Sequence, residues 1–127
     1  MPNMSSLPAE QFKEIIRSLR SDGQGRRSLE KRTGPRVGLR ARLSVRLHRG
    51  GTLSKSSILV WLRDLSVEGI GLVHSQALDD GDEFIAEFPL RNQQNLNVLY
   101  RVVHCKMLSK NLYCIGARLV RMLEESN

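Results

Sequence analysis

The sequence contains few aromatic residues: three Phe, two Tyr and one Trp among 127 residues. So few rings do not build the base-stacking platform of a typical single-stranded nucleic acid binder. Long apolar runs are also absent, because the longest, residues 58–62, is far shorter than the ~20 residues of a transmembrane helix. The first residues have neither the basic start nor the apolar stretch of a secretory signal. We therefore expect a cytoplasmic protein without a membrane span.

Cysteine and histidine are sparse, and their spacing fits no metal centre. C-x-x-C and H-x-x-x-H are absent, as are the Walker, G-x-S-x-G and G-x-G-x-x-G patterns. The acidic turn at residues 79–83 lacks the spacing of an EF-hand. We therefore expect no metal, no cofactor and no catalysis. The histidines are His48, His74 and His104, and the cysteines are Cys105 and Cys114. The two thiols, expected to be reduced, would face each other if residues 108–111 formed a hairpin loop.

Positive charge is concentrated in the first half of the chain. The net charge is +7. Residues 1–56 carry 13 Lys and Arg against 4 Asp and Glu, a net of +9, whereas residues 57–127 carry 7 against 9, a net of −2. This asymmetry indicates an anionic partner, such as nucleic acid, a nucleotide or a membrane surface, unless it serves solubility alone.

Residues 6–20 have the periodicity of an amphipathic helix, with Ser6 as its cap. Its apolar stripe consists of Phe12, Ile15, Ile16 and Leu19. Because the opposite face is charged, this stripe must lie against an apolar surface. We expect that surface to belong to the same domain, with a partner protein, a second copy or a membrane surface as alternatives. Residues 21–36, rich in Gly, Ser and charge, predict a flexible connector.

The remaining sequence predicts short strands separated by turns. Residues 39–48 alternate strictly, with Arg40, Arg42 and Arg46 on the polar face, which we interpret as solvated. Further strands are expected at residues 57–65, 69–74, 83–88, 96–107 and 112–120. Strands at this spacing describe an all-β barrel or sandwich. We expect a helix and linker over residues 1–25, a β-barrel domain over 26–123 and a disordered tail over 124–127.

Two motifs carry the functional signal. Residues 32–36 have the form R-x-x-x-R, with Pro35 before the second Arg, and residues 64–69 have the form D-x-S-x-x-G. In this order and at this separation, they resemble the signature of the PilZ domain family, and the likeness extends over residues 26–121. The resemblance implies an all-β fold, a six-stranded antiparallel barrel, which here follows an N-terminal amphipathic helix. It also implies binding of the bacterial second messenger cyclic di-GMP, with roles in signalling, motility and biofilm formation.

The chemistry of the motif residues suits that ligand. Arg32 and Arg36 each offer a guanidinium fork that bonds bidentately to guanine O6 and N7 or to phosphate oxygens. Asp64 accepts from the guanine N1–H and N2–H₂ groups, and Ser66 donates or accepts through its hydroxyl. Gly69 allows close backbone approach or positive φ. In the family, the position of Lys31, directly before the motif, is associated with one or two bound ligand molecules.

Simpler roles remain open for the same residues. The arginines of the first motif would also serve as ordinary linker charges, and Asp64 and Ser66 as caps of a turn between two strands. On balance the sequence predicts a cyclic di-GMP receptor whose Arg-rich segment closes over the ligand and signals to a protein partner. The alternatives are a small basic barrel that binds RNA or single-stranded DNA, and a PilZ-type adaptor that binds no ligand.

Overall fold

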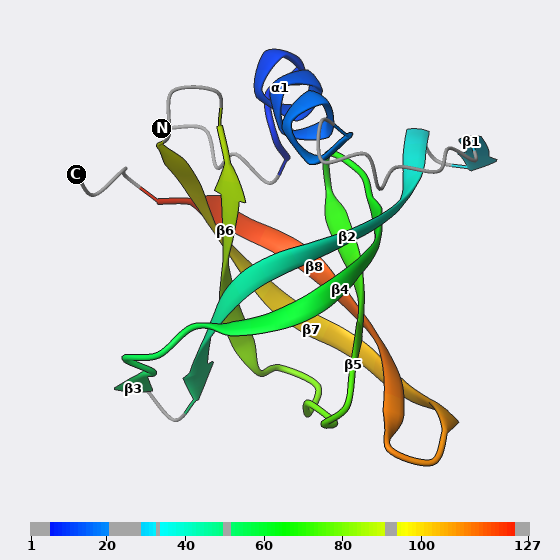
Figure 1. Ribbon diagram of the computed structural model, residues 1–127, viewed down its shortest axis with the longest axis vertical. Helices are drawn as coiled ribbons and strands as arrows, with labels where there is room; N and C mark the ends of the chain where they lie inside the picture. The colour runs from blue at the N-terminus through cyan, green and yellow to red at the C-terminus, as the bar shows by residue number, and fades with distance from the viewer. Residues whose placement is uncertain (1–5, 21–28, 33, 50–51, 91–93, 124–127) are drawn as a thin grey trace.

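The computed structural model describes residues 6–20, 29–32, 34–49, 52–90 and 94–123. Six antiparallel strands close into a barrel, as expected, and helix α1 covers one end of it (Figure 1). The barrel order is β2 (Gly34–Arg49), β4 (Ile58–Leu65), β5 (Gly69–His74), β8 (Leu112–Met122), β7 (Asn95–Ser109) and β6 (Glu83–Pro89). Pairing of β2 with β6 closes the sheet on itself.

Two short strands extend the barrel at the ends of β2. β1 (Leu29–Arg32) pairs with the start of β2, and β3 (Thr52–Leu53) pairs with its end. The sequence predicted a flexible connector over residues 21–36, but the residues of β1 and the first residues of β2 form an antiparallel ladder. Backbone hydrogen bonds to a long neighbouring strand stabilise this polar segment without an apolar pattern. Residues 21–28, 33 and 124–127 lie outside the described part of the chain.

The barrel interior confirms the alternation of the sequence. Leu39, Ala41, Leu43 and Val45 are buried, while Arg40 and Arg42 point outward and are exposed. An aromatic cluster fills the interior beside β6 and β7. In it, the rings of Phe84 and Tyr100 stack at 5.6 Å between centroids, and Phe88 meets Tyr100 edge-on at 6.4 Å.

Helix α1 (Ala9–Arg20) packs against its own domain, as the sequence predicted. Ile15, Ile16 and Leu19 of its stripe are buried, and Phe12 is partly buried against the same core. The expected cap at Ser6 is wrong, because the helix begins at Ala9. The Phe12 amide donates to the Pro8 carbonyl at 2.9 Å, so the first turn starts at the proline, whose fixed φ suits a helix start. No helix in the described ranges is long and apolar enough to cross a membrane.

The hairpin between β7 and β8 turns more tightly than the sequence predicted. β7 continues to Ser109 and β8 begins at Leu112, so the turn consists of residues 110–111, with Asn111 at a φ of 62°. Asn is among the residues that tolerate this left-handed conformation. The resulting register pairs Cys114 with Lys106 and Cys105 with Ile115. The two thiols therefore do not face each other as the longer loop would have required.

Candidate ligand-binding site

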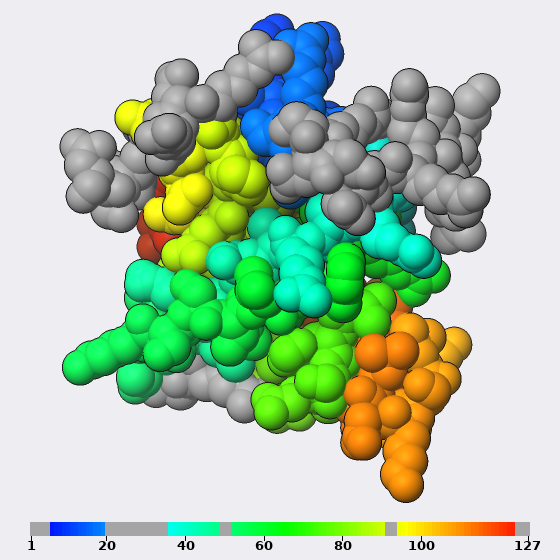
Figure 2. All heavy atoms as spheres, in the orientation of Figure 1, coloured from blue at the N-terminus to red at the C-terminus, as the bar shows by residue number. Residues whose placement is uncertain are grey.

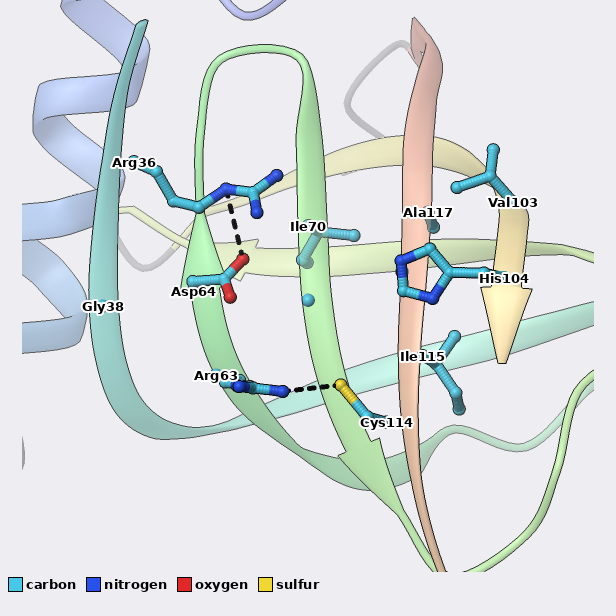
Figure 3. A pocket seen from close by; sticks show the side chains of 12 residues that line it. Arg36, Gly38, Arg63, Asp64, Ile70, Val103, His104, Cys114, Ile115 and Ala117 are labelled. Carbon is cyan, nitrogen blue, oxygen red and sulfur yellow. Dashed lines mark hydrogen bonds and ion pairs between the residues drawn. The ribbon is translucent and has the colours of Figure 1, made fainter. Parts of the chain in front are cut away.

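A pocket of about 450 Å³ lies on the outer surface of the barrel. Its floor is formed by β4, β5 and β8, with β2 on one side and β7 on the other (Figure 3). This volume is within the range of small-molecule sites. The lining residues are Arg36, Gly38, Arg63, Asp64, Ile70, Gly71, Val103, His104, Cys114, Ile115, Gly116 and Ala117.

A row of paired residues crosses five strands beneath this pocket. Gly38 pairs with Asp64, Asp64 with Gly71, Gly71 with Gly116, and Gly116 with His104. Because the glycines have no side chains, only the side chains of Asp64 and His104 cover the backbone of this row. A Cβ at Gly71 would lie 2.7 Å from Oδ1 of Asp64, and a Cβ at Gly116 would collide with the ring of His104. The carboxylate and the imidazole therefore lie flat over a floor of bare backbone.

A β-bulge in β4 brings Arg63 and Asp64 to the pocket together. The register between β4 and β5 shifts between Leu62 and Asp64. Leu62 and Leu65 are both buried although they lie three positions apart in the strand. In a regular strand Asp64 would follow Leu62 into the interior, but an extra residue lets two successive side chains face outward. Arg63 then donates from Nη1 to the Sγ of Cys114 at 2.7 Å (Figure 3).

A second β-bulge, in β7, forms the opposite wall of the pocket. The pairing of β7 with β8 shifts between Val102 and His104. Val102 is buried and Cys105 packs against the core, so the two residues between them, Val103 and His104, are both exposed. His104 thereby faces Arg36 and Asp64 across the pocket (Figure 3).

The structure brings one residue of each motif into contact. Arg36 Nε lies 3.7 Å from Asp64 Oδ1, and the exposed fractions of the two side chains are 44% and 19%. This distance is too long for a hydrogen bond, so the contact is a loose ion pair at the pocket rim. Two motifs separated by 28 positions therefore converge on one site through the pairing of β2 with β4.

Ser66 and Gly69 shape the neighbouring turn and do not line the pocket. The Gly69 amide donates to Ser66 Oγ at 3.1 Å, and the Ser66 amide donates to the Gly69 carbonyl at 3.1 Å. A Cβ at Gly69 would lie 2.9 Å from the Ala117 carbonyl oxygen, so this position requires the absence of a side chain. The turn-capping interpretation thus fits Ser66, whereas Asp64 points into the pocket (Figure 3).

The first residues of the Arg motif pair through their backbone with the start of β2. Arg32 pairs with Gly34, and Lys31 pairs with Pro35, so β1 runs back along the segment that leads to Arg36. The side chains of Lys31 and Arg32 lie outside the described part of the structure.

Sequence reasoning missed Arg63, His104 and the glycines at 71 and 116. A signal existed for the glycines, because a Gly inside a strand often marks a close approach of another group. The part of the chain described by the structure contains no group of three His, Cys, Asp or Glu able to hold a metal ion.

Comparison with known families identifies the domain. The family model described as PilZ domain matches residues 30–127. The chain belongs to the PilZ domain family. No curated protein and no solved structure gives a significant match. PilZ domains bind cyclic di-GMP or serve as adaptors and are not enzymes, so this PilZ domain is a binding or adaptor module. The family match spans both motifs and all six strands of the barrel.

Proposed function

We propose that this protein is a cyclic di-GMP receptor of the bacterial cytoplasm, with the pocket over the glycine row as its binding site. The observation that carries the proposal is the meeting of Arg36 and Asp64 at one pocket rim. A cation with a planar fork and a carboxylate acceptor lie side by side there. Together they complement an anionic phosphate and the N1–H and N2–H₂ edge of guanine.

The glycine floor supports the same assignment. The absence of side chains at Gly71 and Gly116 lets the Asp64 carboxylate and the His104 ring lie against the sheet, which leaves the pocket above them free for a flat purine ring. Asp64 on one side and His104 on the other bound the space that such a ring would occupy. The low exposure of Asp64 strengthens its hydrogen bonds to a bound base.

Ligand binding exchanges one set of contacts for another. Before binding, Arg36 and Asp64 hold each other loosely at 3.7 Å. On binding, Asp64 accepts from the base and Arg36 turns its fork to phosphate or to guanine O6 and N7. Because the initial pair is partly exposed and long, little free energy opposes the exchange.

The remaining motif residues act through the hairpin of β1 and β2 and the turn after β4. Arg32, assisted by Lys31, binds the phosphates as the hairpin closes over the ligand. Ser66 and Gly69 keep the turn in shape. The same turn accepts a hydrogen bond from the Leu7 amide to the Val67 carbonyl at 2.7 Å, just before helix α1 begins.

This hydrogen bond offers a path from the ligand to a downstream protein partner. Closure of the hairpin and adjustment of the turn shift the docking of α1, and the partner recognises the shifted state. The ligand moves this equilibrium only by its greater affinity for the closed state. Hydrogen exchange of residues 9–20 with and without cyclic di-GMP measures the shift, and identical protection would contradict the switch while leaving binding intact.

The nucleic-acid alternative finds no stacking platform in the described part of the barrel. Tyr100 is fully buried, and Arg42 already covers the ring of Trp61 at 5.0 Å. The adaptor alternative remains the rival, and calorimetry decides between it and the receptor.

The test is isothermal titration of the full chain with cyclic di-GMP. We expect saturable binding that Arg36→Ala and Asp64→Ala each weaken roughly 10- to 150-fold, the equivalent of about 1.5–3 kcal/mol for a hydrogen bond to a charged group. Arg42→Ala is the matched control, because it removes an exposed Arg of the same strand outside the pocket. Absence of heat with folded wild-type protein would establish the adaptor. Equal losses at Arg36 and Arg42 would show diffuse electrostatic attraction in place of a site.

A further inference from the structure

A second hollow, of about 560 Å³, lies on the outer surface of the barrel and shares Arg63 with the ligand pocket. We call it the apolar groove. Its apolar lining comes from β2, β4, β5 and β8, and Arg40 and Arg63 complete it. The apolar lining residues are Leu39, Trp61, Leu62, Val73 and Leu112.

Large apolar side chains remain exposed at this groove. The exposed fractions are 42% for Trp61 and 36% for Leu112. Leu112 directly follows the turn of the β7–β8 hairpin, which projects from the barrel at the lower right of Figure 2, and β7 carries the exposed Met107 and Leu108 in the same hairpin. Exposed apolar side chains gathered beside a concavity mark an interaction surface more often than a solvated one.

Positive charge surrounds the apolar lining. Arg40 and Arg63 belong to the groove, and the Arg42 guanidinium lies over the Trp61 ring at 5.0 Å. No acidic residue of the described chain lines the groove. A complementary occupant therefore has apolar side chains for the lining and carboxylates for the rim.

Other occupants fit less well. A nucleic acid base needs an aromatic face, but Arg42 covers one face of Trp61 and the rest of the lining is aliphatic. A flat bilayer surface does not fill a concavity that lies beside a projecting hairpin (Figure 2). A second copy joined by two-fold symmetry would set Arg40, Arg42 and Arg63 against their own copies.

We propose that the apolar groove docks a segment of a partner protein in which apolar residues are flanked by Asp or Glu. Trp61 and Leu112 provide the apolar contact, and the three arginines select for acidic flanks. Aromatic and arginine side chains of this kind dominate the energetics of protein interfaces. Docking does not require cyclic di-GMP, because none of the groove's apolar residues belongs to the ligand pocket, although the two hollows share Arg63.

The experiment selects binding peptides from random sequences, so the partner need not be identified first. A phage-displayed library of random 12-residue peptides is panned on the immobilised full chain. Enriched sequences are then synthesised with a fluorescein label and titrated by fluorescence anisotropy. We expect enriched peptides to combine Leu, Ile, Val or Phe with Asp or Glu. Trp61→Ala, Leu112→Ser and Arg40→Glu are each expected to weaken their binding about tenfold or more.

Two control variants replace an exposed leucine and an exposed arginine that lie outside the apolar groove. Leu53→Ser removes an exposed leucine on β3, and Arg121→Glu reverses an exposed charge near the far end of β8. Both should bind the peptides as the wild type does. Thermal melting verifies the fold of every variant. Because Trp61 and Leu112 are each partly exposed, loss of one variant to misfolding leaves the other to decide the question.

Several results would overturn the proposal. Failure to enrich peptides above an empty surface would do so, as would peptides whose affinity is the same for wild type, Trp61→Ala and Leu112→Ser. Binding of phosphatidylglycerol vesicles or poly-uridine that these variants abolish would assign the groove to lipid or RNA. A dimer in sedimentation velocity that Leu112→Ser dissociates would assign it to a second copy.

Discussion

Three glycines near the pocket leave room for a close neighbour, which is a side chain at two of the positions and backbone at the third. At Gly71 the three atoms nearest to a Cβ all belong to the side chain of Asp64, which can rotate away, whereas at Gly69 the nearest atom is the backbone oxygen of Ala117 at 2.9 Å. A movable neighbour yields at little cost in stability, but a paired strand does not. At Gly116 the neighbour is again a side chain, the ring of His104.

These contacts predict that two similar substitutions affect different properties, one the stability of the fold and the other the binding of the ligand. Gly69→Ala should lower the free energy of unfolding by about 1–3 kcal/mol, because β8 must shift. Gly71→Ala should change stability by less than about 1 kcal/mol yet weaken cyclic di-GMP binding, because Asp64 is displaced and the floor is raised. Urea unfolding and calorimetry measure the two quantities. A Gly69→Ala protein as stable as the wild type would contradict the close contact with β8.

Glu83 provides a pH-dependent contribution to stability away from the pocket. Its carboxylate accepts from Arg101 Nη2 at 2.8 Å and Nε at 3.1 Å, and from His48 Nδ1 at 3.3 Å. The hydrogen bonds from Arg101, followed by the contact with His48, lower the pKa of Glu83 from its ordinary 4.5 against the opposing effect of burial. A carboxyl with a lowered pKa in the folded state stabilises the fold above its unfolded pKa. This stabilisation is lost as pH falls through the lower folded value.

We therefore expect Glu83→Gln to cost up to about 1 kcal/mol at pH 7, the range of a partly exposed ion pair. The cost should shrink at a pH below the folded pKa, where the wild-type carboxyl is also protonated. Urea unfolding of both proteins at pH 7 and at a series of lower pH values measures the difference. A penalty that stays the same throughout the series would mean that packing, and not charge, is lost.

At the scale of elements, helix α1 acts as a lid on one end of the barrel. Ile15 is fully buried at the centre of its apolar stripe, whereas Lys13 is exposed on the opposite face. Ile15→Ala should lower the free energy of unfolding by about 2–4 kcal/mol through lost burial and a residual cavity. Lys13→Ala should leave it nearly unchanged. Equal stability of the two variants, measured by urea unfolding, would show that the helix does not pack on the barrel in solution.

The strands show which parts of the fold a sequence pattern can predict. β2 alternates so regularly that its buried face was evident, but β1 reads Leu-Glu-Lys-Arg and carries no alternation. It forms because the start of β2 offers unpaired backbone groups to bond with. This cause lies in β2, so the sequence of β1 alone does not reveal it. β3 has only two residues, too few to show a period.

The candidate site was predictable in part for a related reason. The motifs pointed to Arg36 and Asp64, and the structure brings them together. Arg63 and His104 enter the pocket through bulges, and one extra residue reverses the face of every side chain that follows. The spacing of inward-facing residues indicates each bulge. Leu62 and Leu65, and likewise Val102 and Cys105, are three positions apart, whereas a regular strand places inward residues two positions apart.

For the whole molecule, ligand binding should appear as thermal stability. A ligand that binds only the folded state adds about 2.7 kcal/mol at 100 times its Kd. For a domain of this size that corresponds to a rise in Tm of roughly 10 °C. We expect this rise for the wild type with cyclic di-GMP, a much smaller one for Arg36→Ala and the full rise for Arg42→Ala. An unchanged Tm for the wild type would favour the adaptor.

The chain holds one tryptophan, and it stands at the apolar groove beneath Arg42. Indole emission from this protein therefore arises at a single known place. A docked segment that displaces the guanidinium and excludes water from the ring would change the colour and intensity of that emission. The protein thus carries its own label-free optical reporter for partner association.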